Sequence, residues 1–410
     1  MAVIDIRNAN VLDVDGGSLL EGRRVIVEGG VIKDIDAGSS KFDGALELDA
    51  KGATLMPGLI DAHVHITAYA DDFQKLAQSS PSYVAAQAAQ SLRESLLRGF
   101  TTIRDVGGAD FGLSNAVEEG LFDGPRLLYG GKALSQTGGH ADMRGPGTDV
   151  VETAYTQPGL GVIVDGVPQV RRAARAELRR GAHHVKIMGG GGAASPTDRL
   201  DSDQFSEDEI AAIVDEAAMA NRYTVVHAYS ARTIERASRL GVRSIEHGNF
   251  LDAKTAQRLK DRNCFMVPTL ITYHATSKHG LDMRLASSTI EKINALVEPG
   301  MRAIELAREA GVPMAYGTDL VGRFLQQFQL SEFSLRREVV PADELIRSAT
   351  TVAAELVQMD RQIGRIAPGY LADIIVVDGN PLRDITVLER PENNLFLVMK
   401  GGKIFKNLLS

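Results

Sequence analysis

The sequence of 410 residues contains a single cysteine, Cys264. One cysteine cannot form an intrachain disulfide, and it cannot build a Cys-x-x-Cys redox pair or a thiolate metal cluster. Any metal ion must therefore be held by nitrogen and oxygen atoms. The sequence also lacks a run of ~18 consecutive apolar residues, and its acidic first residues lack the basic start of a signal peptide. We therefore expect a cytoplasmic protein without a membrane partner.

Basic residues are in deficit, with 45 Lys and Arg against 53 Asp and Glu and a formal net charge of −8. No basic run interrupts the interspersed charges, which excludes a nucleic-acid partner and favours a small molecule. The hydrophobic share of 44% is that of an ordinary globular protein and excludes a disordered chain. The oligomeric state stays open, with a homo-oligomer among the options, because no apolar heptad marks an interface.

Both ends of the chain are rich in short β-branched segments. Residues 1–56 predict strands at 3–6, 24–28, 31–35 and 45–48, and the last fifty residues predict strands at 372–377 and 395–399. Neither end has enough strands for a stable sheet. We therefore expect one small β-sandwich domain, built from residues 1–56 and 360–410, with residues 57–359 inserted between its halves.

The inserted segment alternates apolar runs with helical patterns, which is typical of repeated βα units. Eight strands are predicted, at 59–66, 101–106, 126–130, 183–188, 224–229, 244–248, 264–270 and 314–319. Helices are predicted at 83–98, 168–180, 206–221 with a Ser206–Glu209 capping box, 231–240, 253–262 and 287–310. The fold class is α/β, a (β/α)8 barrel. The alternative, an open doubly wound sheet, lacks its Gly-x-Gly-x-x-Gly motif after the first strand.

Two connections, 131–167 and 271–286, show little periodicity and follow predicted strands. Structureless loops of this length in a compact domain are usually functional. In a barrel, the loops that follow the strands form the active-site face. We therefore expect both connections to act as lids or binding loops.

Five potential metal ligands stand at or near the ends of predicted strands: His63, His65, His227, His247 and Asp319. The first two are two residues apart and therefore point to the same side of their strand. A barrel would bring all five together, and five ligands exceed the four that one zinc ion takes, which indicates two ions. The alternative for each histidine alone is a packed core residue with one hydrogen bond.

Lys186 lies inside the apolar run 185–188. Burial lowers the pKa of a lysine, and the resulting free amine can react with carbon dioxide to give a carbamate that bridges two cations. The alternative is a lysine whose ammonium reaches solvent at the barrel rim.

Five motifs combine these residues: MPGLIDAHVH at 56–65, VKIM at 185–188, VHA at 226–228, IEHG at 245–248 and GTD at 317–319. In order and spacing they resemble the binuclear metallohydrolases of the amidohydrolase superfamily. Within it the chain is similar to the branch that groups imidazolonepropionase-related proteins with Xaa-Pro dipeptidases. The resemblance covers essentially the whole chain, including the divided β-sandwich.

The resemblance implies roles for the ligands. The more buried ion would be held by His63, His65 and Asp319, and the more exposed ion by His227 and His247. Carboxylated Lys186 and a hydroxide would bridge the two ions. Zinc is the expected metal, although manganese and cobalt also accept such ligands. Asp319 would also take the proton of the attacking hydroxide and pass it to the leaving nitrogen.

Three further residues are candidates for substrate binding. His140, after Gly138-Gly139 in the first long connection, resembles a histidine that donates to the substrate oxygen; the alternative is a solvated loop histidine. Tyr229 shares the inward face of its strand with His227 and would hydrogen-bond the substrate, or else is a core tyrosine. The loop 189–196 lacks the ending of a nucleotide-binding P-loop, so its N–H groups would receive a substrate carboxylate, with Arg199 as an accessory.

The bridging lysine favours the dipeptidase side of the branch, because imidazolonepropionase and the mononuclear deaminases do not use one. The sequence therefore predicts a zinc-dependent dipeptidase that releases the C-terminal residue of Xaa-Pro or Xaa-hydrophobic dipeptides. The alternative substrate is another amide: an N-acyl amino acid, a cyclic imidazolone-like amide or an aromatic amino-acid conjugate. A third hypothesis, a catalytically inactive scaffold, predicts missing ligands, whereas all six positions are present.

Overall fold

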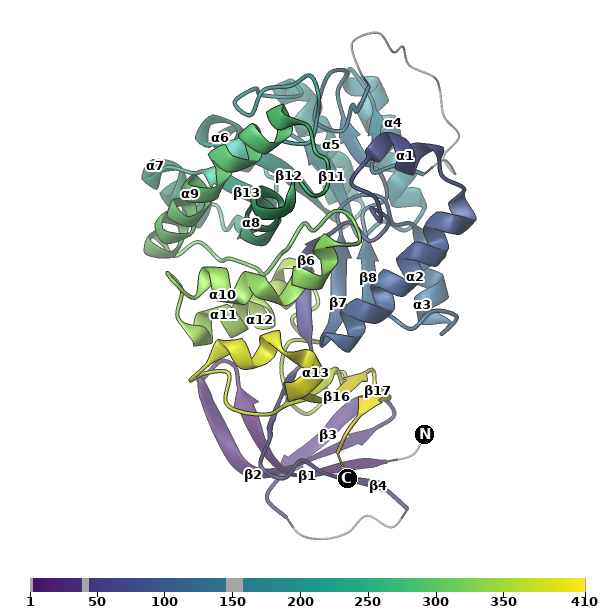
Figure 1. The fold of residues 1–410 in the computed structure, drawn as a ribbon, viewed down its shortest axis with the longest axis vertical. Helices are drawn as coiled ribbons and strands as arrows, with labels where there is room; N and C mark the ends of the chain where they lie inside the picture. Colours follow the sequence, from purple (N-terminus) through teal and green to yellow (C-terminus); the bar gives the residue numbers. More distant parts are fainter. Residues whose placement is uncertain (1–2, 39–43, 145–157, 410) are drawn as a thin grey trace.

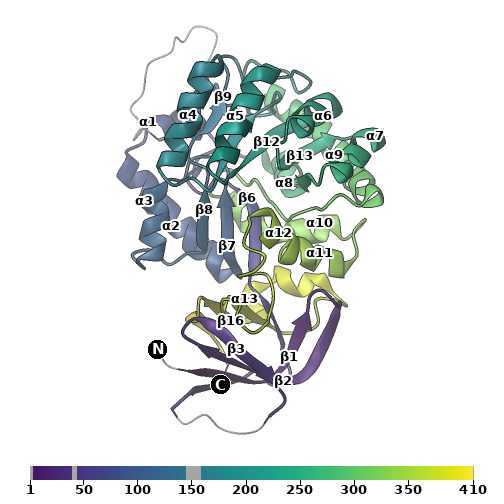
Figure 2. The same ribbon diagram turned by 180° about the vertical axis from the view of Figure 1, so that it is seen from behind.

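Strands from both ends of the chain form one sheet. The computed structural model describes residues 3–38, 44–144 and 158–409. Its eight-stranded sheet is built from β1 (Ile4–Asp13), β2 (Ser18–Glu28), β3 (Val31–Asp36), β4 (Leu46–Asp49), β5 (Thr54–Pro57), β15 (Ile374–Val377), β16 (Leu395–Lys400) and β17 (Lys403–Asn407). The N-terminal β5 pairs antiparallel with the C-terminal β15, so purple and yellow strands lie side by side in Figures 1 and 2.

The small domain has its own hydrophobic core, to which both ends contribute. Ile6, Val25 and Leu55 pack with Ile374 and Leu397, and all five are fully buried. The predicted β-sandwich from both chain ends is thus confirmed. Its boundaries at 56/57 and 359/360 stay a prediction, and β5 runs to Pro57, one residue past the first of them.

A parallel barrel stands above the sandwich. One sheet contains β6 (Leu59–Val64), β7 (Phe100–Asp105) and β8 (Arg126–Tyr129), and a second contains β11 (His184–Met188), β12 (Tyr223–Ser230), β13 (Ser244–Phe250) and β14 (Phe265–Val267). The two sheets meet where the His183 N–H donates to the Tyr129 carbonyl over 2.9 Å. Seven of the eight predicted barrel strands are therefore present.

The eighth predicted strand, 314–319, is not a regular strand. Its only bridge pairs Met314 with Met266, although the Ala62 N–H still donates to the Tyr316 carbonyl over 2.8 Å and closes the barrel. A Cβ at Gly317 would overlap the side chain of Val267 and crowd that of His63. Asp319 has a positive φ of 52°, a left-handed conformation that interrupts a strand.

The two long connections contain secondary structure that the sequence analysis missed. In 131–167, β9 (Ala133–Ser135) and β10 (Gly161–Ile163) extend the second sheet, and residues 145–157 lie outside the described residues. The prediction of an irregular loop at 271–286 is wrong, because α8 (Leu270–His279) occupies most of this segment. This helix buries residues around much of its circumference, so it lacks the 3.6-residue period of an amphipathic helix.

Helices surround the barrel (Figures 1 and 2). They are α1 (Phe73–Gln78), α2 (Pro81–Leu97), α3 (Phe111–Glu118), α4 (Val167–Arg179), α5 (Glu207–Met219), α6 (Ala231–Arg239), α7 (Ala253–Asp261), α9 (Ser287–Ala310), α10 (Glu332–Arg336), α11 (Ala342–Ser348) and α12 (Thr351–Leu356), with a 3-10 turn at Leu325–Ser331. A second 3-10 turn, Ile385–Glu389, and α13 (Pro391–Asn394) lie at the junction with the sandwich (Figure 1), where α13 contacts β16. The predicted capping box of α5 is present, with Glu209 accepting from the Ser206 N–H over 2.7 Å.

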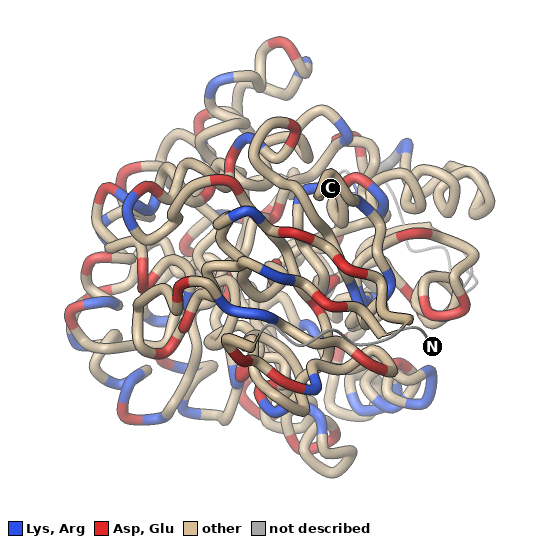
Figure 3. The backbone as a smooth tube through the Cα atoms, turned by 90° about the horizontal axis from the view of Figure 1, so that it is seen from below, with Lys and Arg blue, Asp and Glu red and all other residues tan. Residues whose placement is uncertain are grey.

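Among residues 3–38, 44–144 and 158–409, no helix is both long and apolar enough to cross a bilayer. Seen from below, acidic and basic residues are interspersed along the chain (Figure 3). This agrees with the interspersed charges of the sequence.

Candidate metal centre and substrate pocket

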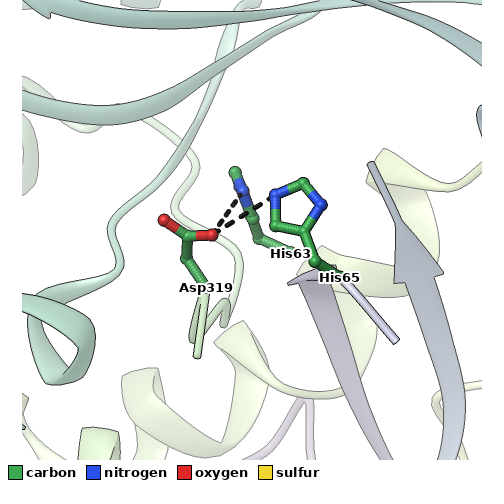
Figure 4. Close-up of side chains that lie close together, drawn as sticks. All are labelled: His63, His65 and Asp319. Atoms are coloured by element: carbon green, nitrogen blue, oxygen red, sulfur yellow. Dashed lines mark ion pairs between the residues drawn. The ribbon is translucent and has the colours of Figure 1, made fainter. Parts of the chain in front are cut away.

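Three of the predicted ligands converge at the mouth of the barrel (Figure 4). His63 and His65 come from the end of β6, and Asp319 follows the extended segment beside it. The Asp319 Oδ1 atom lies 3.4 Å from His63 Nε2 and 3.3 Å from His65 Nε2. Ligand atoms of all three lie within 4.8 Å of one another. Two imidazole nitrogens and a carboxylate oxygen at this spacing form a candidate site for a divalent cation.

The second nitrogen of each imidazole is already paired. His63 Nδ1 donates to Glu246 Oε2 over 2.7 Å, and His65 Nδ1 donates to the Gly107 carbonyl over 2.8 Å. Both Nε2 atoms are therefore left with their lone pairs, as metal ligation requires. His63 Nε2 is buried and has no hydrogen-bond partner among the described residues. A bound cation would satisfy this atom, so the residues present fit a metal ion.

A buried ion pair stands behind His63. Arg104 Nη2 donates to both Glu246 oxygens over 2.9 and 3.0 Å, and Ser244 Oγ donates to Glu246 Oε1 over 2.6 Å. Arg104 and Glu246 are both 0% exposed. Burial opposes ionisation of Glu246, but the nearby Arg104 charge and the hydrogen bond from His63 outweigh it and hold the pKa of Glu246 well below its usual range. The sequence analysis missed both residues, although each is a charged residue inside a predicted strand.

The other two histidines lie beside the first group. His227, on β12, and His247, on β13, have ring centroids 4.7 Å apart, and the His63 ring is 4.9 Å from that of His247. His227 Nε2 donates to the Gly191 carbonyl over 3.0 Å. His247 Nδ1 lies 2.8 Å from Thr269 Oγ1. His247, like Asp319, has a positive φ, here 73°, and such backbone strain is concentrated at functional sites.

Lys186 is only 1% exposed and faces the same space. Burial lowers the pKa of its ammonium to about 8, despite the opposing charges of Glu246 and Asp319. A cavity of about 240 Å³ is lined by Lys186 together with His63, His65, His140, His227, His247 and Asp319. The structure therefore brings all six predicted metal ligands, and His140, to one cavity.

A second cavity of about 320 Å³ adjoins the histidines. His140, His227, Tyr229 and Asp319 line its inner part. Burial raises the pKa of Tyr229, whose hydroxyl accepts from that of Tyr273 over 3.3 Å. Most of the remaining lining is apolar, including Phe73, Met143, Met283, Leu285, Ile293, Val321 and Leu325. The cavity has the mixture of apolar walls and a few polar groups that is typical of a substrate pocket.

His140 is held against His227, with ring centroids 4.2 Å apart. Its Nδ1 lies 2.8 Å from Ser195 Oγ. Burial lowers the pKa of its imidazole to about 4. The alternative of a solvated loop histidine therefore does not describe this side chain.

Arg199 is not brought to the site. Its side chain is 81% exposed and donates to Asp201 Oδ1 over 2.9 Å, and it is absent from the described lining of both cavities. In the loop 189–196, the Gly191 carbonyl accepts from His227, and the N–H groups of Gly189, Gly191 and Gly192 donate to the His227 carbonyl, the Ser202 carbonyl and Asp198 Oδ2. A carboxylate contact from the rest of the loop stays a prediction. At Gly192 a Cβ would overlap the His140 ring. The glycines thus permit close approach to two histidines.

Comparison with known proteins identifies the family. Residues 54–405 match the Amidohydrolase family. An ochratoxinase of Aspergillus niger is 33% identical over 368 residues, which cover 86% of this chain and 75% of that protein. A prolidase structure complexed with N-methylphosphonate-L-proline is 43% identical, with a TM-score of 0.96 over 99% of this chain and 100% of the other. A Xaa-Pro dipeptidase structure with bound methionine is 30% identical, with a TM-score of 0.89 over 99% and 100%.

These matches extend over both the barrel and the sandwich. They confirm the resemblance that the five motifs indicated, and with it the (β/α)8 barrel with a terminal β-sandwich. Members of this family bind divalent metals, and the His63, His65 and Asp319 group provides such a site. The chain is a hydrolase that belongs to the amidohydrolase family, in its prolidase-like branch.

Proposed function

We propose that this enzyme is a binuclear metal-dependent dipeptidase that hydrolyses Xaa-Pro or Xaa-hydrophobic dipeptides and releases the C-terminal residue. The proposal rests on one observation. The four histidines predicted as ligands, Asp319 and the buried Lys186 line a single cavity together with His140, and this cavity adjoins a substrate-sized pocket. A buried lysine among metal-ligating groups has no role in a mononuclear site, whereas a carboxylated lysine can bridge two cations.

His63, His65 and Asp319 would hold one ion, and His227 and His247 the other. Carboxylated Lys186 would supply one oxygen to each. When bound, two divalent cations, zinc by preference, activate a water molecule and polarise the scissile carbonyl group. The absence of sulfur among these side chains leaves a set of nitrogen and oxygen ligands, which zinc, manganese and cobalt all accept.

One carboxylate oxygen of Asp319, Oδ2, remains available for proton transfer. Oδ1 faces His63 Nε2 and His65 Nε2, whereas Oδ2 lies 4.0 Å from His247 Nδ1. Burial opposes ionisation of Asp319, but the surrounding His63, His65 and Lys186 charges outweigh it and lower its pKa to about 2. The carboxylate can therefore accept the proton of the attacking water at Oδ2 and deliver it to the leaving nitrogen, which a prolyl nitrogen requires before it departs.

His140 and Tyr229 would orient the substrate. Both line the pocket and pack against the His227 ring, Tyr229 buried and His140 partly buried, so their polar atoms are held in place before a substrate arrives. A polar group that is fixed in advance loses little entropy when the substrate binds. The similarity to a prolidase and to a Xaa-Pro dipeptidase over nearly the whole chain supports a dipeptide as the substrate.

A second substrate class, an amino acid that carries an apolar acyl or aromatic group, is favoured by the pocket lining. Phe73, Met143, Met283 and Leu285 surround space that a large apolar group would fill. The similarity to an ochratoxinase supports this alternative. The two substrate classes differ in whether a free amino group flanks the scissile amide.

The deciding experiment uses two substrate panels and a metal analysis. The purified enzyme, loaded with zinc, would be assayed against Xaa-Pro and Xaa-hydrophobic dipeptides and against the same C-terminal residues carrying aromatic acyl groups. We expect close to two ions per chain and higher kcat/KM for the dipeptides. Turnover of the acylated panel alone would select the second class. A folded protein that binds no metal would contradict both.

A further inference from the structure

A chain of hydrogen bonds leads from His140 to a buried carboxylate that the proposed mechanism does not use. His140 Nδ1 lies 2.8 Å from Ser195 Oγ, and Ser195 Oγ donates in a short hydrogen bond to Asp198 Oδ1. The Ser195 residue is 2% exposed and the Asp198 side chain 3% exposed. Asp198 lies outside the described lining of the two cavities, so it reaches the substrate only through these contacts.

The donor and the acceptor of each of these hydrogen bonds follow from counting the available hydrogens. Asp198 is surrounded by donors: besides Ser195 Oγ, the Gly192 N–H and Gln204 Nε2 donate to its Oδ2 over 3.1 and 2.8 Å. A carboxylate with three donors and no acceptor beside it acts as an ionised acceptor. Ser195 has one hydroxyl hydrogen, and both its acceptors, Asp198 Oδ1 and the more distant Gly192 carbonyl at 3.3 Å, draw it away from His140. The contact between Ser195 and His140 must therefore be donated by the Nδ1–H of the imidazole.

Further hydrogen bonds hold the loop that contacts His140. Lys292 of α9 donates to the carbonyls of Gly192, Ser195 and Asp198 over 3.2, 3.0 and 2.8 Å. Gln204 Oε1 accepts from the His140 backbone N–H over 2.9 Å while its Nε2 binds Asp198, so the same amide ties the histidine to the carboxylate. The space above Gly192 admits the imidazole only because no Cβ is present.

We propose that Asp198 is a positioning residue for His140, acting through Ser195. It keeps the proton of the neutral imidazole on Nδ1 and leaves Nε2 as the nitrogen that meets the substrate. In this neutral tautomer Nε2 carries a lone pair and meets the substrate as a hydrogen-bond acceptor, whereas the family resemblance implied a donor. This inference rests on the proposed function for the part His140 plays, but the tautomer and the hydrogen-bond chain do not depend on the substrate. The loop 189–198 thus serves as a support for histidines, where the sequence suggested a carboxylate-binding loop.

The test compares two variants that interrupt the series of hydrogen bonds from His140 to Asp198 with one control variant that leaves it intact. Asp198→Asn removes the charge, and Ser195→Ala removes the connecting hydroxyl while leaving Asp198 its bonds from Gly192 and Gln204. The control is Asp203→Asn, in the same loop, whose carboxylate binds Thr233 and Arg232 instead. All would be prepared with zinc and checked for metal content. The measurements are the pH profiles of kcat and kcat/KM, and the 15N shifts of the His140 ring, assigned with His140→Gln.

We expect the wild type and Asp203→Asn to show the Nδ1–H tautomer. Ser195→Ala and Asp198→Asn should lose that fixed tautomer, and their kcat should fall about 10–100-fold at unchanged metal content. An Nε2–H tautomer in the wild type, or one unaltered in Ser195→Ala, overturns the proposal. So does a kcat for Ser195→Ala equal to that of Asp203→Asn. If the wild type hydrolyses no amide, the proposed function fails while the tautomer measurement still decides this inference.

Discussion

At the scale of single residues, the fully buried Arg104 and Glu246 are costly to remove from water. An ion pair inside a barrel loses its hydration, and a hydrophobic pair of similar volume is often at least as stable. Here the pair has a use, because Glu246 also accepts from His63 Nδ1 and so directs Nε2 toward Asp319. We therefore infer that the ion pair orients a metal ligand, and that packing in the rest of the barrel offsets its cost in stability.

The first prediction concerns this pair. In the double variant Arg104→Met, Glu246→Gln neither charge is stranded, so the barrel should fold. The affinity for zinc should fall about 10–100-fold, since supports of metal ligands typically contribute that much. Competition with a chelator measures the affinity. The matched control is Arg302→Met, Glu305→Gln, which removes an exposed pair on α9. An affinity equal to that of this control would show that the buried pair does not act on the metal.

The second prediction concerns Lys186. Lys186→Met keeps the volume of a fully buried side chain but cannot react with carbon dioxide. We expect metal content to fall from about two ions per chain toward one, and kcat/KM to fall more than about 100-fold, beyond the effect of an outer-shell residue. Elemental analysis and steady-state assays provide the measurements, and circular dichroism checks the fold. A variant with two ions and full activity would remove the carbamate from the proposal.

Among the elements, α8 shows where sequence patterns fail. Its first residues, Leu270 to Tyr273, are all buried, because the helix packs against α9, α10 and the 3-10 turn Leu325–Ser331 and contributes to the substrate pocket. The 3.6-residue period arises only when one face meets water. The six helices predicted from periodicity have such a face. Periodicity therefore identified α2, α4, α5, α6, α7 and α9, and it missed α8 at the substrate pocket together with the shorter helices α1, α3 and α10 to α13.

The third prediction concerns the carboxyl group at the start of α8. Glu332 Oε2 accepts from the Ile271 N–H over 2.7 Å, and burial raises the pKa of Glu332 to about 8 despite Arg336. The folded protein then keeps this proton up to about pH 8, whereas the unfolded chain releases it near pH 4.5. This group therefore reduces the free energy of unfolding as the pH rises from about 5 to 8.

Glu332→Gln removes that titration. Relative to the wild type, the variant should gain about 1–3 kcal/mol in free energy of unfolding between pH 5 and pH 8. This gain is smaller than the full pKa difference implies, because the charged Arg336 side chain can move toward the ionised carboxylate of the wild type. Urea unfolding at several pH values provides the measurement. Glu338→Gln is the exposed control on the segment that follows. A difference that is independent of pH would contradict the raised pKa.

At the scale of the whole molecule, the architecture could be predicted from the order of strand and helix patterns along the sequence, without knowledge of individual contacts. Alternating βα units predict a barrel, and strand-rich ends predict a shared sheet. The metal ligands were predictable because His63, His65, His227 and His247 end apolar runs, and parallel strands end at one face. Ser195 and Asp198 were not, since their role depends on where a loop places them against His140. Non-local contacts of this kind leave no period in a sequence.

The last prediction concerns how the barrel is joined to the sandwich. Two ion pairs cross this junction: Arg126 of β8 with Asp373 over 2.6 Å, where Asp373 is 3% exposed, and Asp123 with Lys403 of β17 over 3.4 Å, where both side chains are exposed. Asp373 also accepts from the Gly401 N–H over 2.8 Å. Removing one partner of a buried pair strands the other, whereas an exposed pair contributes little.

Asp373→Ala should therefore lower the free energy of unfolding by about 2–4 kcal/mol, and Asp123→Ala by less than about 1 kcal/mol. Thermal unfolding of the zinc-loaded enzyme, followed by calorimetry, would compare the two variants. Neither residue lines a described cavity, so metal content and kcat should be unchanged in both. If the two variants lost equal stability, burial at the junction would not matter. If Asp373→Ala lost metal, the sandwich would be supporting the metal centre across the barrel, because Arg126 lies on a barrel strand two places from β6.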